Sequence, residues 1–212
     1  MQNLDEIAER IRQSFEARTE ARDRALSQSR ALTRACSNTI RAVHRDDNDV
    51  AKENLSEAHL LVETIQSNLA QYPDLYHAGY TQDALKEYAE AKIVYALILD
   101  NPLPTPEELG LEYATYLKGL AETSGELRRR CLDILRHGHS EEAERLLSLM
   151  DDIYAVLVTM DYPDAITGGL RRLTDIVRGV NERTRGDMTI SLRQEHLEES
   201  MRRLDDKLSR KE

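Results

Sequence analysis

Glycine and proline are scarce in this chain, and this scarcity restricts its fold more than any other feature. Only nine glycines and five prolines occur in 212 residues. All five prolines fall at a few breaks, near Pro73, between Pro102 and Pro106, and at Pro163. Between the breaks, apolar residues recur with a helical period, and no useful length alternates with the period of two that a strand requires. The sequence therefore predicts an all-α protein.

The breaks divide the chain into long segments joined by short connections. We expect helices over these residues: 2–45, 48–71, 81–100, 106–137 and 140–160, with one or two more over 164–209. The fourth begins with Thr105 as N-cap, Pro106 in the first position and Glu108 to complete a capping box. Long helices with short connections predict an antiparallel bundle of about six to seven helices, whose first and last members are long.

An apolar seam marks the C-terminal end of the chain. Leu197, Met201, Leu204 and Leu208 recur at spacings of four, three and four within a charged amphipathic segment, about residues 196–212. This spacing covers only about two heptads and is typical of a packing or oligomer contact.

Composition predicts a single domain over residues 1–212 and no membrane association. No apolar run approaches the roughly 18 residues of a membrane span, and the N-terminus lacks a signal-peptide core, so we expect a cytoplasmic protein. Cys36 and Cys131 both project from the apolar faces of predicted helices, which predicts buried, reduced thiols.

A row of arginines on the first predicted helix contrasts with a net charge of −10, which argues against a generic nucleic-acid coat. No acidic residue occurs between Arg24 and Arg45. Four arginines in this stretch project within about 60° of one another and form what we call the arginine stripe: Arg30, Arg34, Arg41 and Arg45. The stripe suits the phosphates of a nucleic-acid backbone, but acids on a neighbouring helix or subunit would neutralise it equally well.

Two glutamates fall on the apolar side of the third predicted helix. At about 100° per residue, Glu87 and Glu90 share an arc with Ala84, Val94 and Leu97. A carboxylate pointed into a core is costly unless a proton, a cation or a metal compensates it. The pair therefore predicts a metal site, or else a contact with arginines across an interface.

A second pair, Glu122 and Glu126, lies on the polar side of the fourth predicted helix. Periodicity alone indicates ordinary surface acids there. Lys118 and Arg129 project on the same side and could hold a phosphate or form salt bridges.

Two segments that carry these glutamates resemble the translin/Trax family. Residues 86–91, KEYAEA, are similar to that family's Q-E-F-V-E-A helix. Residues 116–127, YLKGLAETSGEL, resemble its Y-L-x-G-x-x-D-L-T-G-E-L segment, and residues 177–187 match loosely. The resemblance covers roughly residues 5–195 and is closer to Trax, the catalytic partner, than to translin.

The resemblance implies a translin-like helical subunit that assembles into a shell, as an octamer, and binds RNA and single-stranded DNA. A Trax-like subunit is a Mg²⁺-dependent endoribonuclease, with a paralogous translin-like subunit as a possible partner. By motif position, Glu87, Glu90, Glu122 and Glu126 would be the catalytic and metal-binding residues. Glu122 stands where the motif has Asp, so its carboxylate is carried on a longer arm.

The residue types suit this chemistry, because carboxylate oxygens prefer Mg²⁺ or Mn²⁺. Nucleic-acid contacts would come from the arginine stripe, Lys118 and Arg129. His137 and His139 flank a predicted turn and are not expected to form a metal site. Two rival functions stay open, a translin-like binding protein without catalysis and a helical scaffold whose arginine stripe pairs with another subunit.

Overall fold

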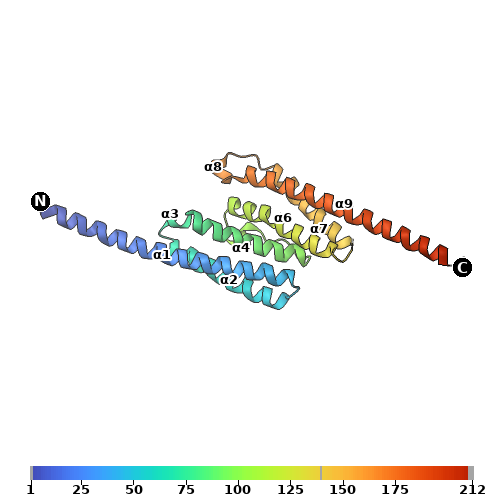
Figure 1. The fold of residues 1–212 in the computed structure, drawn as a ribbon. Helices are drawn as coiled ribbons and strands as arrows, with labels where there is room; N and C mark the ends of the chain where they lie inside the picture. Colours follow the sequence, from blue (N-terminus) through green and yellow to red (C-terminus); the bar gives the residue numbers. More distant parts are fainter. Residues whose placement is uncertain (1, 139, 210–212) are drawn as a thin grey trace. The chain divides into compact units, whose positions relative to one another are not determined.

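The computed structural model describes residues 2–138 and 140–209 and is helical throughout (Figure 1). Over these residues it contains no strand, which confirms the predicted all-α class. Nine helices lie in the described residues: α1 (Gln2–His44), α2 (Asn48–Leu69), α3 (Pro73–Tyr76), α4 (Gly79–Ile98), α5 (Pro106–Leu109), α6 (Tyr113–Leu135), α7 (Glu141–Val158), α8 (Asp164–Thr167) and α9 (Leu170–Ser209). Six are long, and α3, α5 and α8 are single turns of four residues.

The prediction of one continuous helix over 106–137 is wrong, because this segment contains two helices, α5 and α6. The predicted capping box is present: Glu108 accepts from the backbone N–H of Thr105 at 2.7 Å, and the Thr105 hydroxyl accepts from that of Glu108 at 3.2 Å. However, α5 ends after one turn because Gly110 adopts a left-handed conformation with φ of 64°. Glycine takes this conformation without steric cost. A new helix, α6, starts only at Tyr113.

The described residues form two compact units that divide within helices. The first contains the residues up to 96 together with 102–119, and the second contains 97–101 and the residues from 120 onward. Helix α6 runs without interruption through this division. The predicted single domain over 1–212 remains a prediction.

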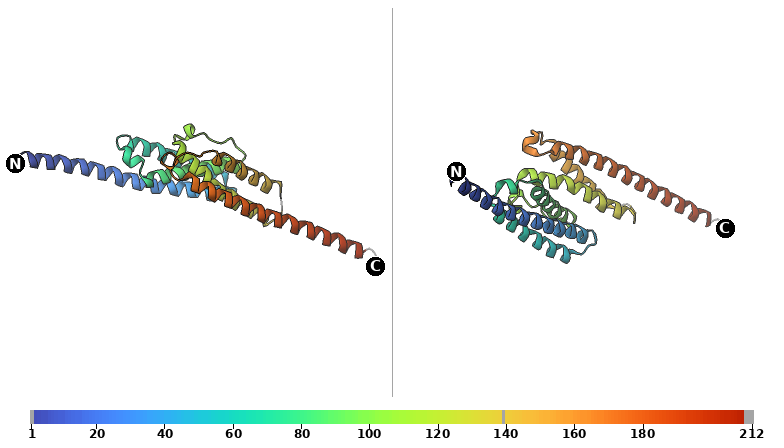
Figure 2. Two further views of the ribbon diagram at one scale, coloured as in Figure 1. Left: turned by 90° about the horizontal axis from the view of Figure 1, so that it is seen from above. Right: turned by 60° about the vertical axis from the view of Figure 1, so that its left-hand side comes forward.

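In the first unit, α1 and α2 lie antiparallel along each other (Figure 2). Small residues on α1, among them Ala21, Ala25 and Cys36, are almost completely buried. The helix α2, which packs along α1, has a buried stripe of its own that includes Leu55, Val62 and Ile65. Small side chains let two helix backbones approach closely, and the aliphatic side chains fill the remaining space.

In the second unit, α7 packs along α9 through apolar and polar contacts. Leu146 and Met150 of α7 are completely buried. The side-chain amide of Asn181 on α9 donates to the backbone carbonyl of Met150 at 2.8 Å. This buried hydrogen bond fixes one relative position of the two helices, because a shift would leave a polar group unpaired.

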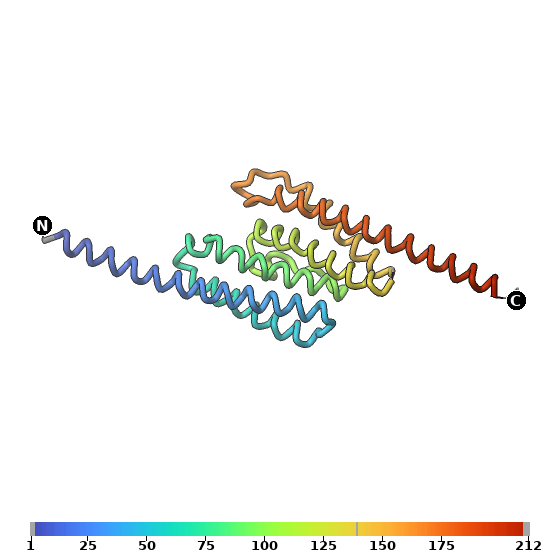
Figure 3. The backbone as a smooth tube through the Cα atoms, in the orientation of Figure 1, coloured from blue at the N-terminus to red at the C-terminus, as the bar shows by residue number. Residues whose placement is uncertain are grey.

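Figure 3 traces the backbone of the first turns of α1 and of the last turns of α9. Apolar side chains are exposed on both of these segments. On α1, the stripe that is buried further along continues outward through Leu4, Ile7, Ile11 and Phe15, which are 38 to 65 % exposed. On α9, the predicted seam is equally open, and its members are 58 to 63 % exposed: Leu197, Met201, Leu204 and Leu208. No helix in the described part of the chain is both long and apolar enough to cross a membrane.

Candidate metal centre

Glu90 and Glu87 lie on α4, a helix that is buried on most of its circumference. Tyr88, Ala89 and Ala91, which surround them in sequence, are inaccessible to solvent. Glu90 is only 8 % exposed, and the side chain of Glu87 is 30 % exposed. The predicted placement of this pair on the packed side of the helix is therefore confirmed. Such carboxylates require compensation by a cation or by hydrogen bonds.

Glu87 and Glu90 produce a negative potential inside the first unit. Lys86 offsets part of it, with its Nζ 3.6 Å from an oxygen of Glu87. Burial, followed by the charges of Glu87 and Glu90, raises the pKa of the Cys36 thiol on α1. Cys36 therefore stays protonated, in agreement with the prediction of a buried, reduced thiol. The atoms here that could bind a metal are the oxygens of the glutamates.

Gly119 allows α6 to approach α4 beside these glutamates. A Cβ atom at position 119 would lie 2.6 Å from the Cβ of Ala89, 2.9 Å from the backbone nitrogen of Glu90 and 2.9 Å from the carbonyl oxygen of Lys86. Only glycine fits where the two backbones come this close. Residue 119 belongs to the segment that resembles the translin/Trax motif, and that glycine was the available sequence signal for this contact.

Glu122 and Glu126 follow Gly119 on α6 at spacings of three and four, so the three residues project from one face of the helix. Both glutamates are partly buried, and the side chain of Glu126 is 25 % exposed. The expectation of ordinary surface acids, which came from periodicity alone, is therefore wrong. An oxygen of Glu126 lies 3.5 Å from Nη1 of Arg129.

Three of the four predicted ligands form a group that could hold a metal ion. These are Glu87, Glu90 and Glu122, the one such group among the described residues. All of the available donors are carboxylate oxygens, which fits Mg²⁺ or Mn²⁺ better than the softer metals that select cysteine or histidine. Glu126 is not a member of this group.

The predicted nucleic-acid contacts differ in their surroundings. All four residues of the arginine stripe are exposed, and none forms an ion pair with a described residue. Lys118 is partly buried on α6. Arg129 is half-exposed and forms an ion pair with Glu126. This is the salt bridge that the sequence offers as the alternative to a phosphate contact.

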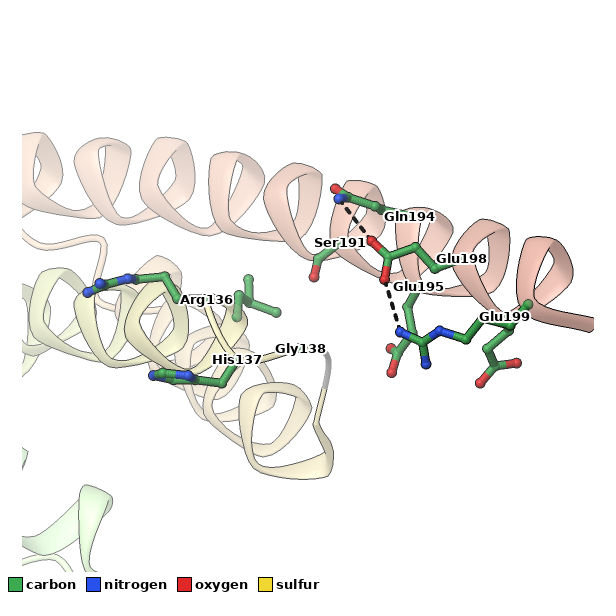
Figure 4. A pocket seen from close by; sticks show the side chains of 10 residues that line it. Arg136, His137, Gly138, Ser191, Gln194, Glu195, Glu198 and Glu199 are labelled. Atoms are coloured by element: carbon green, nitrogen blue, oxygen red, sulfur yellow. Dashed lines mark hydrogen bonds and ion pairs between the residues drawn. The ribbon is translucent and has the colours of Figure 1, made fainter. Parts of the chain in front are cut away.

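His137 lies beside a polar hollow of about 420 Å³ in the second unit (Figure 4). The end of α6, the residues that follow it and the C-terminal half of α9 line this hollow. Glu198 there interacts with Gln194 and Arg202. The candidate metal-binding group among the described residues does not include His137. His139 lies outside the described residues.

Comparisons with known proteins identify relatives over most of the chain. The sequence matches no protein-family model. It is 35 % identical over 185 residues to an uncharacterised protein of Methanocaldococcus jannaschii, covering 86 % of this chain and 82 % of that protein.

Solved structures of C3PO proteins share the fold. C3PO from Archaeoglobus in complex with duplex RNA gives a TM-score of 0.80 at 30 % identity, over 87 % of this chain and 95 % of that chain. The same protein in a further crystal structure gives 0.79 at 31 %, over 87 % and 96 %. A further C3PO, in its apo form, gives 0.80 at 23 %, over 87 % and 96 %, and shows the fold alone. At this identity and coverage, the chain belongs to the translin/Trax family.

Proposed function

We propose that this protein is a Trax-like, Mg²⁺-dependent endoribonuclease that cleaves RNA held within a translin-like assembly. The observation that carries this proposal is the group formed by Glu87, Glu90 and Glu122. It occurs in a family whose Archaeoglobus member was solved with duplex RNA. Glu90 is buried and the other two are partly buried. Acids withdrawn from water are costly to keep in a fold, so three of them together, all with oxygen donors, favour a bound cation.

The four glutamates take complementary parts in this proposal. Glu87, Glu90 and Glu122 hold the ion, and Glu126 completes the site from the next turn of α6, on the face that Gly119 and Glu122 share. A bound Mg²⁺ would polarise a water molecule and offset the charge that develops on the scissile phosphate. Lys118 faces the same side and holds that phosphate. Arg129 keeps Glu126 oriented through their ion pair.

The arginine stripe supplies the RNA-binding surface. Its four guanidinium groups lack acidic partners among the described residues and are exposed. Arginines one or two helical turns apart match successive phosphates of a backbone. The stripe carries no aromatic side chain, so recognition is of backbone and shape rather than of unstacked bases. Single-stranded DNA would be a second ligand of the same surface.

Self-association completes the assembly. The exposed apolar stripe at the start of α1 and the seam at the end of α9 are larger than the scattered apolar residues of an ordinary monomer surface. A second copy of the chain, carrying the same surfaces, is the occupant that we propose for them. We expect a closed oligomer such as an octamer, which a paralogous translin-like subunit could also join.

The test is cleavage of a labelled RNA with Mg²⁺ or Mn²⁺ by the wild type and by Glu90→Gln and Glu122→Gln. Each substitution keeps the shape of the side chain and removes one charge from the group. We expect cleavage to fall by about 100-fold or more and Mn²⁺ affinity, measured by calorimetry, to fall in parallel. Cleavage that survives both substitutions would show that the site is assigned wrongly.

A second candidate function is RNA binding without cleavage. The arginine stripe favours this second function, because its guanidinium groups are exposed and form no ion pair with a described residue. The stripe could bind RNA whether or not the glutamates hold a metal. RNA binding that persists in the wild type with no cleavage in Mg²⁺ or Mn²⁺ would support this function instead.

A further inference from the structure

A groove lies on the side of α4 that faces away from Glu87 and Glu90. On a helical wheel, Tyr88, Lys92 and Tyr95 project to that side. Two adjoining cavities of about 460 and 570 Å³ open there, and His59 of α2 and Lys92 line both. Their volumes lie in the range of small-molecule sites.

Lys92 carries a charge that the fold does not neutralise. Its side chain is partly buried, and no described carboxylate forms an ion pair with it. Its Nζ lies 5.7 Å from the ring centre of Tyr88, so a cation–π contact gives only partial compensation. An ammonium group withdrawn from water without an anion destabilises the folded state.

Two acids at or next to the groove already have partners. Glu108 lines it, but one of its oxygens accepts from the backbone N–H of Thr105 at 2.7 Å in the capping box. Glu63 lies 3.6 Å from Nε2 of His59 and is mostly exposed. The position beside Lys92 is therefore open to an external anion.

Further groups converge on the same groove. Nδ1 of His59 lies 3.0 Å from the hydroxyl of Tyr88, which holds the imidazole in a fixed orientation. Lys52 and the hydroxyl-bearing Ser56 line the wider cavity. The chain has only six lysines against twenty-three arginines, and two of the six line this one groove. Lysine binds phosphate as a compact point charge.

The groove also offers apolar surface. Leu60, which is 62 % exposed, lines the wider cavity, and Leu103, which is 45 % exposed, lines the other. Tyr95 adds an aromatic ring. An anion with an apolar or planar body would cover these side chains while its charge meets the lysines.

We propose that this groove is a binding site for a small phosphate ester, with its phosphate held by Lys92 and Lys52 and its body placed against Leu60, Tyr95 and Leu103. Two lysines suit the charge of a phosphate monoester, which is about −1.5 to −2 at neutral pH. The site is independent of the proposed nuclease centre, because it uses the opposite side of α4 and none of the glutamates there.

The experiment is calorimetric titration of the full-length protein with adenosine 5′-monophosphate, with adenosine as the probe that lacks phosphate. Lys92→Met removes the charge and keeps the length of the side chain. Lys207→Met removes the same charge from α9 and serves as the control. We expect saturable binding of the monophosphate by the wild type and the control, roughly tenfold weaker or absent binding by Lys92→Met, and no binding of adenosine.

Thermal unfolding gives a second reading. In the absence of ligand, Lys92→Met should unfold at a Tm up to about 4 °C higher, since it removes an uncompensated charge. The monophosphate should raise the Tm of the wild type and of Lys207→Met, but not that of Lys92→Met. Wild-type protein that does not bind the monophosphate, or binding that Lys92→Met leaves unchanged, overturns the proposal. The proposal is also overturned if Lys92→Met loses RNA binding but keeps its binding of the monophosphate. The groove would then belong to the RNA-binding surface.

Discussion

At the scale of single residues, Gly119 sets how closely α6 can approach α4. A side chain there would meet the Cβ of Ala89 and two backbone atoms, and backbone cannot turn aside as a flexible side chain can. We expect Gly119→Ala to destabilise the fold by about 1–3 kcal/mol. It should also weaken Mn²⁺ binding, because the clash falls at the backbone of Glu90. Denaturant unfolding and calorimetry measure the two effects.

The same helix supplies the control for this experiment. A Cβ at Gly125 would have no atom within 4 Å. Gly125→Ala should therefore be neutral, or stabilising by about 0.5–1 kcal/mol, since alanine favours helix. If both variants unfold at the same denaturant concentration, the close approach at Gly119 does not constrain the fold.

The candidate site could be predicted only in part from the sequence, for a reason visible at these residues. Glu87 and Glu90 stand out because the period of α4 alone places them among apolar neighbours. Glu122 and Glu126 do not stand out, because their neighbours on α6 are polar and only the family resemblance indicates them. On a helical wheel of α4, Lys92 falls outside the apolar arc, as a surface lysine would, so the sequence does not indicate that it is partly buried. Its desolvation depends on residues far away in sequence, such as His59 and Leu103.

At the scale of elements, the arginine stripe gives α1 a positively charged face, which we propose contacts the phosphates of RNA. We expect Arg34→Glu with Arg41→Glu to weaken RNA binding and to lower the slope of log K against log salt by about 2, since two phosphate contacts are lost. Circular dichroism should be unchanged, because both side chains are exposed. Fluorescence anisotropy at several salt concentrations measures the slope.

A matched charge reversal on α9, Arg202→Glu with Arg203→Glu, makes the same change to net charge elsewhere in the chain. It should leave the slope nearly unchanged. If the stripe variant binds RNA as the wild type does, the stripe pairs with acids of another subunit instead.

If two copies pair through the seam at the end of α9, as proposed, the charges beside it favour one direction of pairing. With Leu197 and Leu204 at d positions, Arg193 falls at g and Glu198 at e. In a parallel pair of copies, Arg193 of one meets Glu198 of the other. In an antiparallel pair, Glu198 meets Asp205, which repels. We therefore expect Leu208→Cys to form a disulfide between two copies on mild oxidation, seen on a non-reducing gel.

Asp206→Cys, on the outer side of α9, is the control and should not crosslink. The two native cysteines will not interfere, since both are buried. Equal crosslinking from the two positions, or none from Leu208→Cys, would contradict parallel pairing through the seam.

Element boundaries could be predicted where one residue type decides them. Proline and the capping box placed the start of α5 correctly, and glycines mark the turn between α8 and α9. The break after Leu109 was missed because the apolar period continues across Gly110. The termination there depends on the left-handed backbone of one residue and on contacts such as the hydrogen bond from Gln66 to the Gly110 carbonyl, 2.6 Å long.

At the scale of the whole molecule, charge confines where RNA can bind. The chain carries 39 acidic and 29 basic residues, so most of its surface repels a polyanion. In the proposed function, the arginine stripe is a local exception that would orient the nucleic acid as well as attract it. Salt screens the contacts between these arginines and the phosphates. We therefore expect added salt to weaken both the affinity for RNA and the preference for one position of the RNA along the stripe.

The outward continuation of α1 has a consequence for how the protein forms. From Leu4 to Phe15 the helix has no core beneath it, and a stretch of this length is only marginally helical in water by itself. Its stripe of Leu4, Ile7, Ile11 and Phe15 would be buried by the second copy proposed above, and this burial would stabilise the helix. If the chains associate as proposed, ordering of these first turns and association would be one coupled transition, and subunit concentration would govern a part of the secondary structure itself.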